Sequence, residues 1–332
     1  MRPSGSNSDL YRFHRPKLSL QDTPYPLKRE SKQCLRNLAS YRTPRAPPYP
    51  RAQCAAVLVA LFVGRMGDLY VLLSRRSETL RAYAGDTALP GGKVDPEDRT
   101  IEDTARREAF EEIGLPRDKQ RVPLLCVLEP FLAGNEMLVT PVVVLILDNT
   151  LRPVLNTPEV HTLFSHPLAS FLSSSFPSSA SLPSSLFFAN AEAYTETAAL
   201  ELKYHTYTDI RSLSGPLREP EARPLVRMHR FLTGREAGGI KPIFGLTAAI
   251  MIRTASVAYE RTPDFTVHAP GEPPMGMRVA WTLRRPGERL REALANEGCE
   301  GNKLEKLAKA WEQWKWGPSA KGNGRNPRRV KL

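Results

Sequence analysis

Three carboxylates lie close together within one short stretch of the chain. Residues 104–115 are predicted to form a helix that Gly114 ends. At about 100° per residue, Glu108, Glu111 and Glu112 fall within roughly 100° of one another around this helix. Carboxylates this close repel, by about 4 kcal/mol for a pair about 4 Å apart at an effective dielectric of about 20. A hard divalent cation such as Mg²⁺ prefers oxygen ligands, so these glutamates are candidate metal ligands.

A second interpretation of the same glutamates needs no metal. A glutamate-rich helix face is commonly solvated, and Arg107 with Glu111 would form an ordinary i,i+4 pair contributing about 0.3 to 0.5 kcal/mol. The surrounding residues favour the metal. A Pro-Gly-Gly loop at 90–92, an Arg-Glu doublet at 107–108 and a Glu-Glu-Ile-Gly-Leu run at 111–115 form a string too long to expect by chance.

This string resembles the Nudix box, which is written G-x5-E-x7-R-E-U-x-E-E-x-G-U, with U apolar. Residues 107–115 match its second half, with Ala109 as a small residue at the apolar position. The resemblance implies that Glu108, Glu111 and Glu112 bind Mg²⁺ or Mn²⁺ and that Arg107 orients these glutamates.

The first half of the box departs from the pattern. Counting back from the Arg-Glu doublet places Arg99 where the pattern has Glu and Lys93 where it has Gly. One extra loop residue restores Gly92 and offers Asp98 as the acid. Asp98 therefore belongs to the match only loosely, while the three box glutamates are unaffected.

A second motif comes just before the box. Residues 72–77, Arg81, Gly85 and residues 89–92 resemble L-L-T-x-R-[SA]-x3-R-x3-G-x3-F-P-G-G, the signature of coenzyme A pyrophosphatases within the Nudix superfamily. Every spacing is kept, although Ser74 replaces Thr and Leu89 replaces Phe.

The second motif implies a phosphate-binding set of arginines. Coenzyme A carries a diphosphate and a 3′-phosphate, and Arg binds phosphate oxygens bidentately. Arg75, Arg76 and Arg81 are the candidates, although any one of them alone fits a solvated strand end or loop equally well. The resemblance also places Gly91 and Gly92 at the substrate, with a backbone carbonyl near Gly92 beside the metal.

The composition of the 332 residues suits a globular protein that binds a polyanion. The net charge of +12 favours anionic ligands, and no segment resembles an RNA- or DNA-reading module, so a nucleic-acid partner is not expected. The four cysteines form no C-x-x-C pair, which argues against a zinc site or a disulfide framework. The longest apolar run, residues 54–63, is too short to span a membrane.

The pattern along the chain predicts three regions. Residues 1–50 hold ten Lys or Arg against three acids and are predicted to be a flexible, partly docked arm. Residues 51–270 form the catalytic domain, with a Ser-rich surface loop at 173–185. Residues 271–332 form a helical extension and a basic tail, in which Glu288 to Trp316 reads as one or two amphipathic helices whose tryptophans pack rather than bind ligand.

Apolar runs predict the strands of the central region. The predicted strands are Ala55–Val63, Leu69–Leu73, Leu124–Pro130 and Leu138–Leu147. The predicted helix follows the second of them and turns Ala105, Ala109 and Ile113 inward. This order is typical of an α/β fold, and the resemblance implies the Nudix α/β/α sandwich with a mixed sheet.

Two later segments also resemble coenzyme A-type Nudix enzymes. Asn156-Thr157-Pro158-Glu159-Val160 matches an N-x-x-E-V segment, and Glu159 is predicted to begin a helix, where an acid is favoured. A stabilising role at the helix start and a functional role, as a fourth metal ligand or as the base, are equally expected for Glu159. Residues 241–252 resemble the [W/F]-G-x-T-A element that closes the Nudix sheet, in which Thr247 can cap a helix.

The last three residues bear on location. The chain ends Val330-Lys331-Leu332, which resembles the peroxisomal address Ser-Lys-Leu except at its first residue. Peroxisomes are the expected location, with cytoplasm and mitochondria as alternatives.

Three functions remain open from the sequence. The first is metal-dependent hydrolysis of the diphosphate of coenzyme A or a derivative, giving 3′,5′-ADP and 4′-phosphopantetheine or its acyl form. In it, Glu108 is the base by the resemblance and Glu159 is the rival. The second is a Nudix hydrolase of another substrate, such as ADP-ribose, NADH or a dinucleoside polyphosphate. The third is a non-catalytic Nudix binding module. The acyl preference and the oligomeric state are not indicated.

Overall fold

A mixed β-sheet forms the centre of the protein. The computed structural model describes residues 10–11, 23–148, 150–176, 203–212, 223–285 and 288–315. Strand β1 pairs in parallel with β7 and antiparallel with β2 and β4, so the predicted mixed sheet is confirmed. Its path runs β3-β2-β1-β7-β5, with β4 on β1, β6 on β7 and β8 on β2. The strands are β1 (Cys54–Val63), β2 (Leu69–Arg76), β3 (Thr87–Ala88), β4 (Gly91–Lys93), β5 (Leu124–Val127), β6 (Phe131–Leu132), β7 (Leu138–Ile146) and β8 (Val160–Pro167).

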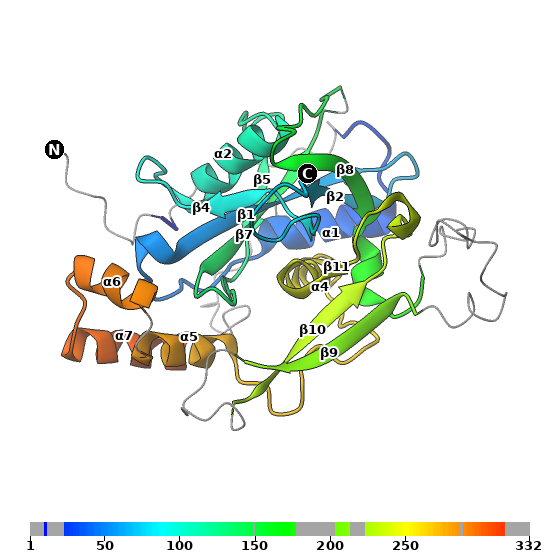
Figure 1. The fold of residues 1–332 in the computed structure, drawn as a ribbon. Coiled ribbons are helices and arrows are strands. Elements are labelled where there is room, and N and C mark those ends of the chain that lie inside the picture. The colour runs from blue at the N-terminus through cyan, green and yellow to red at the C-terminus, as the bar shows by residue number, and fades with distance from the viewer. Residues whose placement is uncertain are drawn as a thin grey trace, which may run out of the picture.

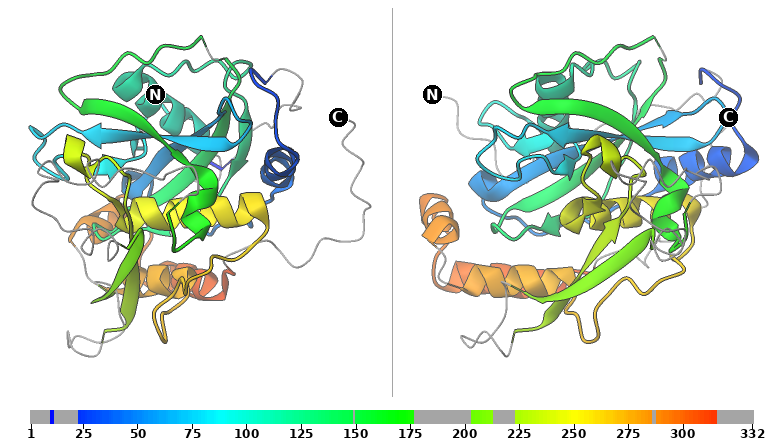
Figure 2. Two further views of the ribbon diagram at one scale, coloured as in Figure 1. Left: turned by 90° about the vertical axis from the view of Figure 1, so that its right-hand side faces the viewer. Right: turned by 45° about the vertical axis from the view of Figure 1, so that its right-hand side comes forward.

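Helices cover both faces of this sheet. Because side chains alternate along a strand, β1 sends Val59 and Leu61 into a core shared with α1 (Arg29–Ser40) and α4 (Gly245–Tyr259). It sends Leu58 and Ala60 into a second core shared with α2 (Ile101–Ile113). Figure 1 shows α2 on one side of the sheet and α1 with α4 on the other, and Figure 2 shows the same layers from two further sides. The α/β/α sandwich is confirmed.

Helix α2 has defined ends and a buried stripe. The Thr100 hydroxyl accepts a hydrogen bond from Asp103 N at 3.1 Å at its start, and Gly114 ends it with φ at 66°. Ala105, Ala109 and Ile113 are buried, as predicted. The helix therefore holds its glutamate-bearing side in a fixed direction.

A small second sheet and further helices complete the described structure. The sheet has the order β11-β10-β9, and β11 leads directly into α4. The remaining elements are the strands β9 (His205–Arg211), β10 (Leu225–Phe231) and β11 (Ile243–Phe244), the helices α5 (Met275–Arg284), α6 (Glu288–Asn296) and α7 (Asn302–Gln313), and the 3₁₀ turns η2 (Arg51–Gln53), η3 (Leu168–Leu172) and η7 (Glu236–Gly238).

The tryptophan-bearing segment forms α6 and α7. Trp311 is fully buried and its indole N–H donates to Pro48 O at 3.1 Å, while Trp314 packs edge-on against Trp311. The packing role is confirmed for these two, and Trp316 lies outside the described residues. The predicted Ser-rich loop beyond Phe176 and the C-terminal tail lie outside them as well.

Three local expectations differ from the structure. The segment 1–50 contains α1, which buries Leu35 and Leu38 in the core because its apolar side meets α4. Glu159 does not begin a helix: a turn at 157–159 leads into β8, which pairs with β2. Thr247 does not cap α4, which starts two residues earlier at Gly245 without a side-chain cap.

Among the described residues, no helix is long and apolar enough to cross a membrane.

A buried histidine is expected to make stability fall in acid. His166 is 4% exposed, its Nε2 lies 2.8 Å from the Tyr204 hydroxyl, and burial, helped by the charge of Arg235, lowers its pKa to about 3. The pKa of this histidine in the unfolded chain is about 6.5, so below that pH the unfolded chain binds a proton that the folded chain does not bind. The free energy of unfolding should therefore drop by up to about 1.4 kcal/mol per pH unit between roughly pH 6.5 and 4.

Urea unfolding at several pH values tests this expectation. His166→Gln removes the titrating group and should give a shallower slope than the natural protein. His161→Gln, at an exposed position of the same strand, is the matched control. Equal slopes for the natural and His166→Gln proteins would contradict the prediction.

Candidate active site

Two of the predicted metal ligands, Glu108 and Glu112, turn toward the loop at Gly91 and Gly92. Gly91 N donates to Glu112 Oε2 at 3.3 Å. The Glu108 carboxylate fills the space beside Gly92, where a Cβ would lie 2.5 Å from Glu108 Cδ and Oε1. Pairing of β4 with the start of β1 holds the loop in this position. The two carboxylates and the glycine loop therefore form one site.

Burial and neighbouring charges raise the pKa of both carboxyl groups. Glu112 is 5% exposed, and its pKa rises to about 7, mainly through burial and further through the charges of Glu108 and Glu159. Arg76 opposes this rise, with its Nη1 3.8 Å from Glu112 Oε1. Burial also raises the pKa of Glu108, against the lowering effect of Arg107. Both shifts reflect the unfavourable free energy of a buried negative charge, and a cation bound beside the carboxylates would reduce that free energy.

Arg107 donates hydrogen bonds to four groups around the site. Its Nε and Nη2 donate to Asp98 at 3.1 and 2.9 Å, and its Nη1 donates to Glu108 Oε1 at 2.8 Å and Glu111 Oε2 at 3.1 Å. Its Nη2 also donates to Lys93 O at 2.9 Å. The bond to Asp98 is the main cause that raises the pKa of the guanidinium. These contacts fix the directions of Glu108 and Glu111.

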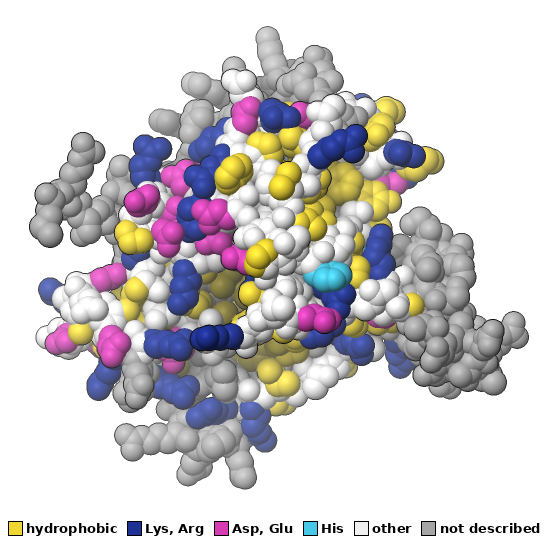
Figure 3. Space-filling view, turned by 45° about the horizontal axis from the view of Figure 1, so that its top comes forward, with side chains coloured by type: hydrophobic (Ala, Val, Ile, Leu, Met, Phe, Trp, Pro, Cys, Tyr) yellow, Lys and Arg dark blue, Asp and Glu magenta, His cyan; other side chains and the backbone are white. Residues whose placement is uncertain are grey.

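Glu111 lies on the outer side of the site. Its side chain is 48% exposed and also pairs with Arg117, whose Nη2 is 3.7 Å from Glu111 Oε1. Figure 3 shows one face of the molecule on which acidic side chains gather with basic ones among them.

The predicted arginines do not converge on one point. Arg76 lies beside Glu112, as described, while its neighbour Arg75 belongs to the opposite side of the strand. Arg75 pairs with Glu78 and lies against Gly239. Arg81 is exposed in the loop at 77–86 and makes no ion pair with a described residue. Arg76 is therefore the member of the set that contacts a carboxylate of the site.

Glu159 joins the site from the start of β8. Its carbonyl accepts a hydrogen bond from Ser77 N at 2.8 Å, which ties it to the end of β2. Its charge raises the pKa of Glu112, so the two carboxylates lie within electrostatic range.

The fit of a metal rests on the chemistry of these side chains. Within the described ranges, no three His, Cys, Asp or Glu side chains are already grouped to hold a metal ion. Arginines neutralise the predicted ligands instead: Arg107 contacts Glu108 and Glu111, and Arg76 contacts Glu112. The donors are all carboxylate oxygens, and the raised pKa values of Glu108 and Glu112 show a site that favours added positive charge. The residues fit a hard divalent cation, whose charge would add to that of the neighbouring arginines in neutralising the carboxylates.

The sequence match included Asp98 only loosely, whereas in the structure Asp98 accepts two hydrogen bonds from Arg107. This side chain is 7% exposed and is the main partner of Arg107. Burial acts to raise the pKa of Asp98, but the hydrogen bonds from Arg107 and from Asp95 N outweigh it and lower the pKa. The only signal in the sequence is an acid in the glycine loop nine residues before Arg107, and spacing alone does not reveal the pairing.

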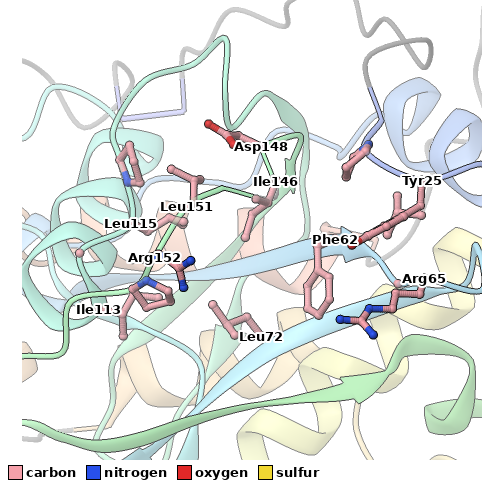
Figure 4. Close-up of a pocket in the computed structure, with 16 residues that line it drawn as sticks. Tyr25, Phe62, Arg65, Leu72, Ile113, Leu115, Ile146, Asp148, Leu151 and Arg152 are labelled. Atoms are coloured by element: carbon pink, nitrogen blue, oxygen red, sulfur yellow. The ribbon is translucent and has the colours of Figure 1, made fainter.

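A pocket of about 330 Å³ lies beyond the C-terminal end of α2 (Figure 4). Its walls are mostly apolar, and the Arg65 and Arg152 side chains extend along it. None of the predicted site residues lines it. The lining residues are Pro24, Tyr25, Phe62, Val63, Gly64, Arg65, Leu72, Ile113, Gly114, Leu115, Pro116, Ile146, Asp148, Leu151, Arg152 and Pro153.

Comparison with known proteins identifies the family of the chain. The NUDIX domain family matches residues 52–180. Nudix hydrolase 22, chloroplastic, from Arabidopsis thaliana is 33% identical over 260 residues, which covers 78% of this chain and 72% of the relative. Nudix hydrolase 15, mitochondrial, from the same plant is 36% identical over 65% of this chain and 62% of the relative.

A third relative bears on specificity. Peroxisomal coenzyme A diphosphatase 1 from Saccharomyces cerevisiae is 48% identical over 95 residues, which covers 27% of this chain and 28% of the relative. The chain thus spans less than two thirds of two of these three relatives. The match to the chloroplastic hydrolase over most of its length, together with the glutamate helix and its glycine loop, shows that the chain belongs to the Nudix hydrolase family.

Proposed function

We propose that the protein hydrolyses the diphosphate bond of coenzyme A or a derivative of it, giving 3′,5′-ADP and 4′-phosphopantetheine or its acyl form. The observation that carries the proposal is the spaced motif of residues 72–92. In this motif, Arg76 Nη1 lies 3.8 Å from Glu112 Oε1, and the two glycines border Glu112 and Glu108. The similarity to the yeast coenzyme A diphosphatase supports the same substrate.

In the proposed mechanism, Glu108, Glu111 and Glu112 would hold Mg²⁺ or Mn²⁺. When bound, the cation neutralises non-bridging phosphate oxygens and lowers the pKa of a water. Glu108 takes the proton as water oxygen bonds to phosphorus and the bridging oxygen leaves, with Glu159 as the alternative base. Arg107 keeps Glu108 oriented, and its bond to Asp98 keeps Arg107 itself in place.

The arginines are proposed to bind the anionic substrate. Arg76 lies beside Glu112 and would pair with a phosphate oxygen of the substrate. Arg75 and Arg81 lie in the same motif, and the Nε of both Arg75 and Arg76 is buried without a hydrogen-bond partner among the described residues. Gly92 keeps the space beside the Glu108 carboxylate clear of side chains, and Gly91 N donates to Glu112.

A substrate panel tests the proposal. The purified protein with Mg²⁺ or Mn²⁺ is expected to hydrolyse coenzyme A with a kcat/KM at least about tenfold above those for ADP-ribose, NADH and dinucleoside polyphosphates. Glu111→Gln serves as the control for turnover by a contaminating enzyme. Faster turnover of ADP-ribose would favour the second candidate, a Nudix hydrolase of another substrate. Binding of coenzyme A without turnover under any metal would favour a non-catalytic module.

For location, we infer peroxisomes from residues 330–332, Val-Lys-Leu, and from the peroxisomal relative in yeast. Fluorescent fusions with and without the final three residues test it, and a diffuse signal from both would remove the peroxisomal inference.

A further inference from the structure

Tyr83 combines exposure with an uncommon backbone conformation. It lies in the loop at 77–86 that joins β2 to β3, and its side chain is 65% exposed. Its φ is 57°, in the left-handed region that disfavours residues with a Cβ. The ring stacks on no other aromatic ring of the described residues. An exposed ring in a strained backbone makes no evident contribution to folding.

The base of this loop is held firmly from outside. Lys241 Nζ donates to Ala84 O at 2.8 Å and to Asp86 Oδ1 at 2.7 Å, and Thr87 Oγ1 donates to Lys241 O at 2.6 Å. Asp86 N also donates to Tyr83 O at 3.2 Å. Lys241 thus holds the residues that follow Tyr83, and the bond from Asp86 N closes the turn in which Tyr83 lies.

The loop begins at the candidate active site, and a short stretch of chain joins its other end to the same site. At its start, Arg76 lies beside Glu112, and Ser77 N bonds the carbonyl of Glu159. At its end, β3 leads within two residues to Gly91, whose N–H bonds Glu112. The loop therefore lies at the rim of the carboxylate site.

The loop carries an aromatic side chain and an arginine side chain, and these two types bind the base and the phosphate of nucleotides. An aromatic face stacks on a heterocyclic base, and an arginine without an ion-pair partner binds a phosphate. Arg81, two residues before Tyr83, is such an arginine among the described residues. We propose that Tyr83 stacks on the heterocyclic base of the nucleotide half of the substrate. This rests on the proposed function, in which the pantetheine half carries no aromatic ring and the nucleotide half carries the base.

Steady-state kinetics with coenzyme A gives the first test. Tyr83→Ala should raise KM by about 5- to 150-fold, the range for loss of one base–aromatic stack, with little change in kcat. Tyr83→Phe and Tyr83→Trp should keep KM near the natural value. Met66→Ala, at a 76% exposed position in the β1–β2 turn, is the matched control. An unchanged KM in Tyr83→Ala, or no rescue by the aromatic variants, overturns the proposal.

Fluorescence of Tyr83→Trp tests the contact directly. Titration with 3′,5′-ADP should quench the new tryptophan relative to a Met66→Trp control, whereas 4′-phosphopantetheine should not. Quenching by 4′-phosphopantetheine alone would overturn the stacking role. If the natural protein does not turn over coenzyme A but ADP-ribose quenches the variant, the proposed substrate fails while the stacking role stands.

Thermal unfolding separates binding from folding. Glycine adopts positive φ without strain, so Tyr83→Gly should raise Tm by about 2 to 4 °C while it raises KM. A structural tyrosine would behave in the opposite way, since its removal would lower Tm. A lower Tm in Tyr83→Gly with KM unchanged overturns the proposal.

Discussion

Replacing Glu112 with glutamine should reduce turnover of the preferred substrate by about 10²- to 10³-fold, equivalent to roughly 3 to 4 kcal/mol in the barrier. Glu112 is the most buried of the three box glutamates, lies beside Arg76 and the glycine loop, and interacts electrostatically with Glu108 and Glu159. Loss of its charge removes a central proposed metal ligand without changing the size of the side chain. Initial rates at saturating Mg²⁺ measure the effect.

The same variant should be more stable than the natural protein when metal is absent. The pKa of Glu112 is raised to about 7 in the folded state, so its stabilising contribution is complete below the unfolded pKa near 4.5 and is lost as the pH rises through about 7. Glutamine resembles the protonated form. In EDTA at pH 8, Glu112→Gln should therefore gain at least about 1 kcal/mol over the natural protein, since one pKa unit corresponds to about 1.4 kcal/mol.

Controls make the Glu112 prediction specific. The stability difference should vanish near pH 4.5, and Mg²⁺ should raise the Tm of the natural protein much more than that of the variant. Full turnover by Glu112→Gln would rule out the metal role of this residue. A variant destabilised at every pH would show that its carboxylate acts in folding instead.

Substituting Gly92 with alanine should cost at least about tenfold in kcat/KM while leaving the fold intact. The added Cβ would lie 2.5 to 2.7 Å from the carboxylate atoms of Glu108. A carboxylate at the end of a flexible side chain can move, so the clash displaces the proposed base rather than the backbone. A displacement of about 1 Å at a reacting group can cost up to about 10²-fold in rate.

Gly91 provides the matched control for this prediction. A Cβ at Gly91 would meet backbone, at 2.3 Å from Ala56 O and 2.7 Å from Val57 Cα. Gly91→Ala should therefore lower Tm sharply, whereas Gly92→Ala should leave Tm almost unchanged. Circular dichroism melts and kinetics of both proteins separate the two effects. Similar melting losses in both variants would show that Gly92 is held for folding alone.

The sequence predicts most of the central architecture because its signals are local. The strand β1 is an uninterrupted apolar run, β2 begins with five apolar residues, and β7 is largely apolar, while α2 carries both an inward stripe and a glycine that ends it. Helix α1 was not predicted because its apolar side is narrow, within a basic segment rich in proline. Its partner α4 begins more than two hundred residues later, and packing of this kind decides helix formation beyond local preference.

The site shows the same division between local and distant information. The spacing along one helix is enough to place Glu108 and Glu112 together. The sequence does not reveal that Arg76 reaches Glu112 while Arg75 turns away, because this depends on how β2 lies against α2. The turn before Glu159 was misread as a helix start, since an acid after Pro158 suits either structure.

The packing of α1 on α4 determines where the chain can be shortened. Asn37 Nδ2 donates to Ala258 O at 2.8 Å, joining two helices that lie on either side of the sheet-forming stretch in the sequence. A fragment that contains the sheet-forming stretch without these two helices would leave one apolar surface of the sheet, including Val59 and Leu61, exposed to water. Such a fragment would aggregate through that bare surface, so the smallest autonomous piece extends at least from residue 29 to residue 259.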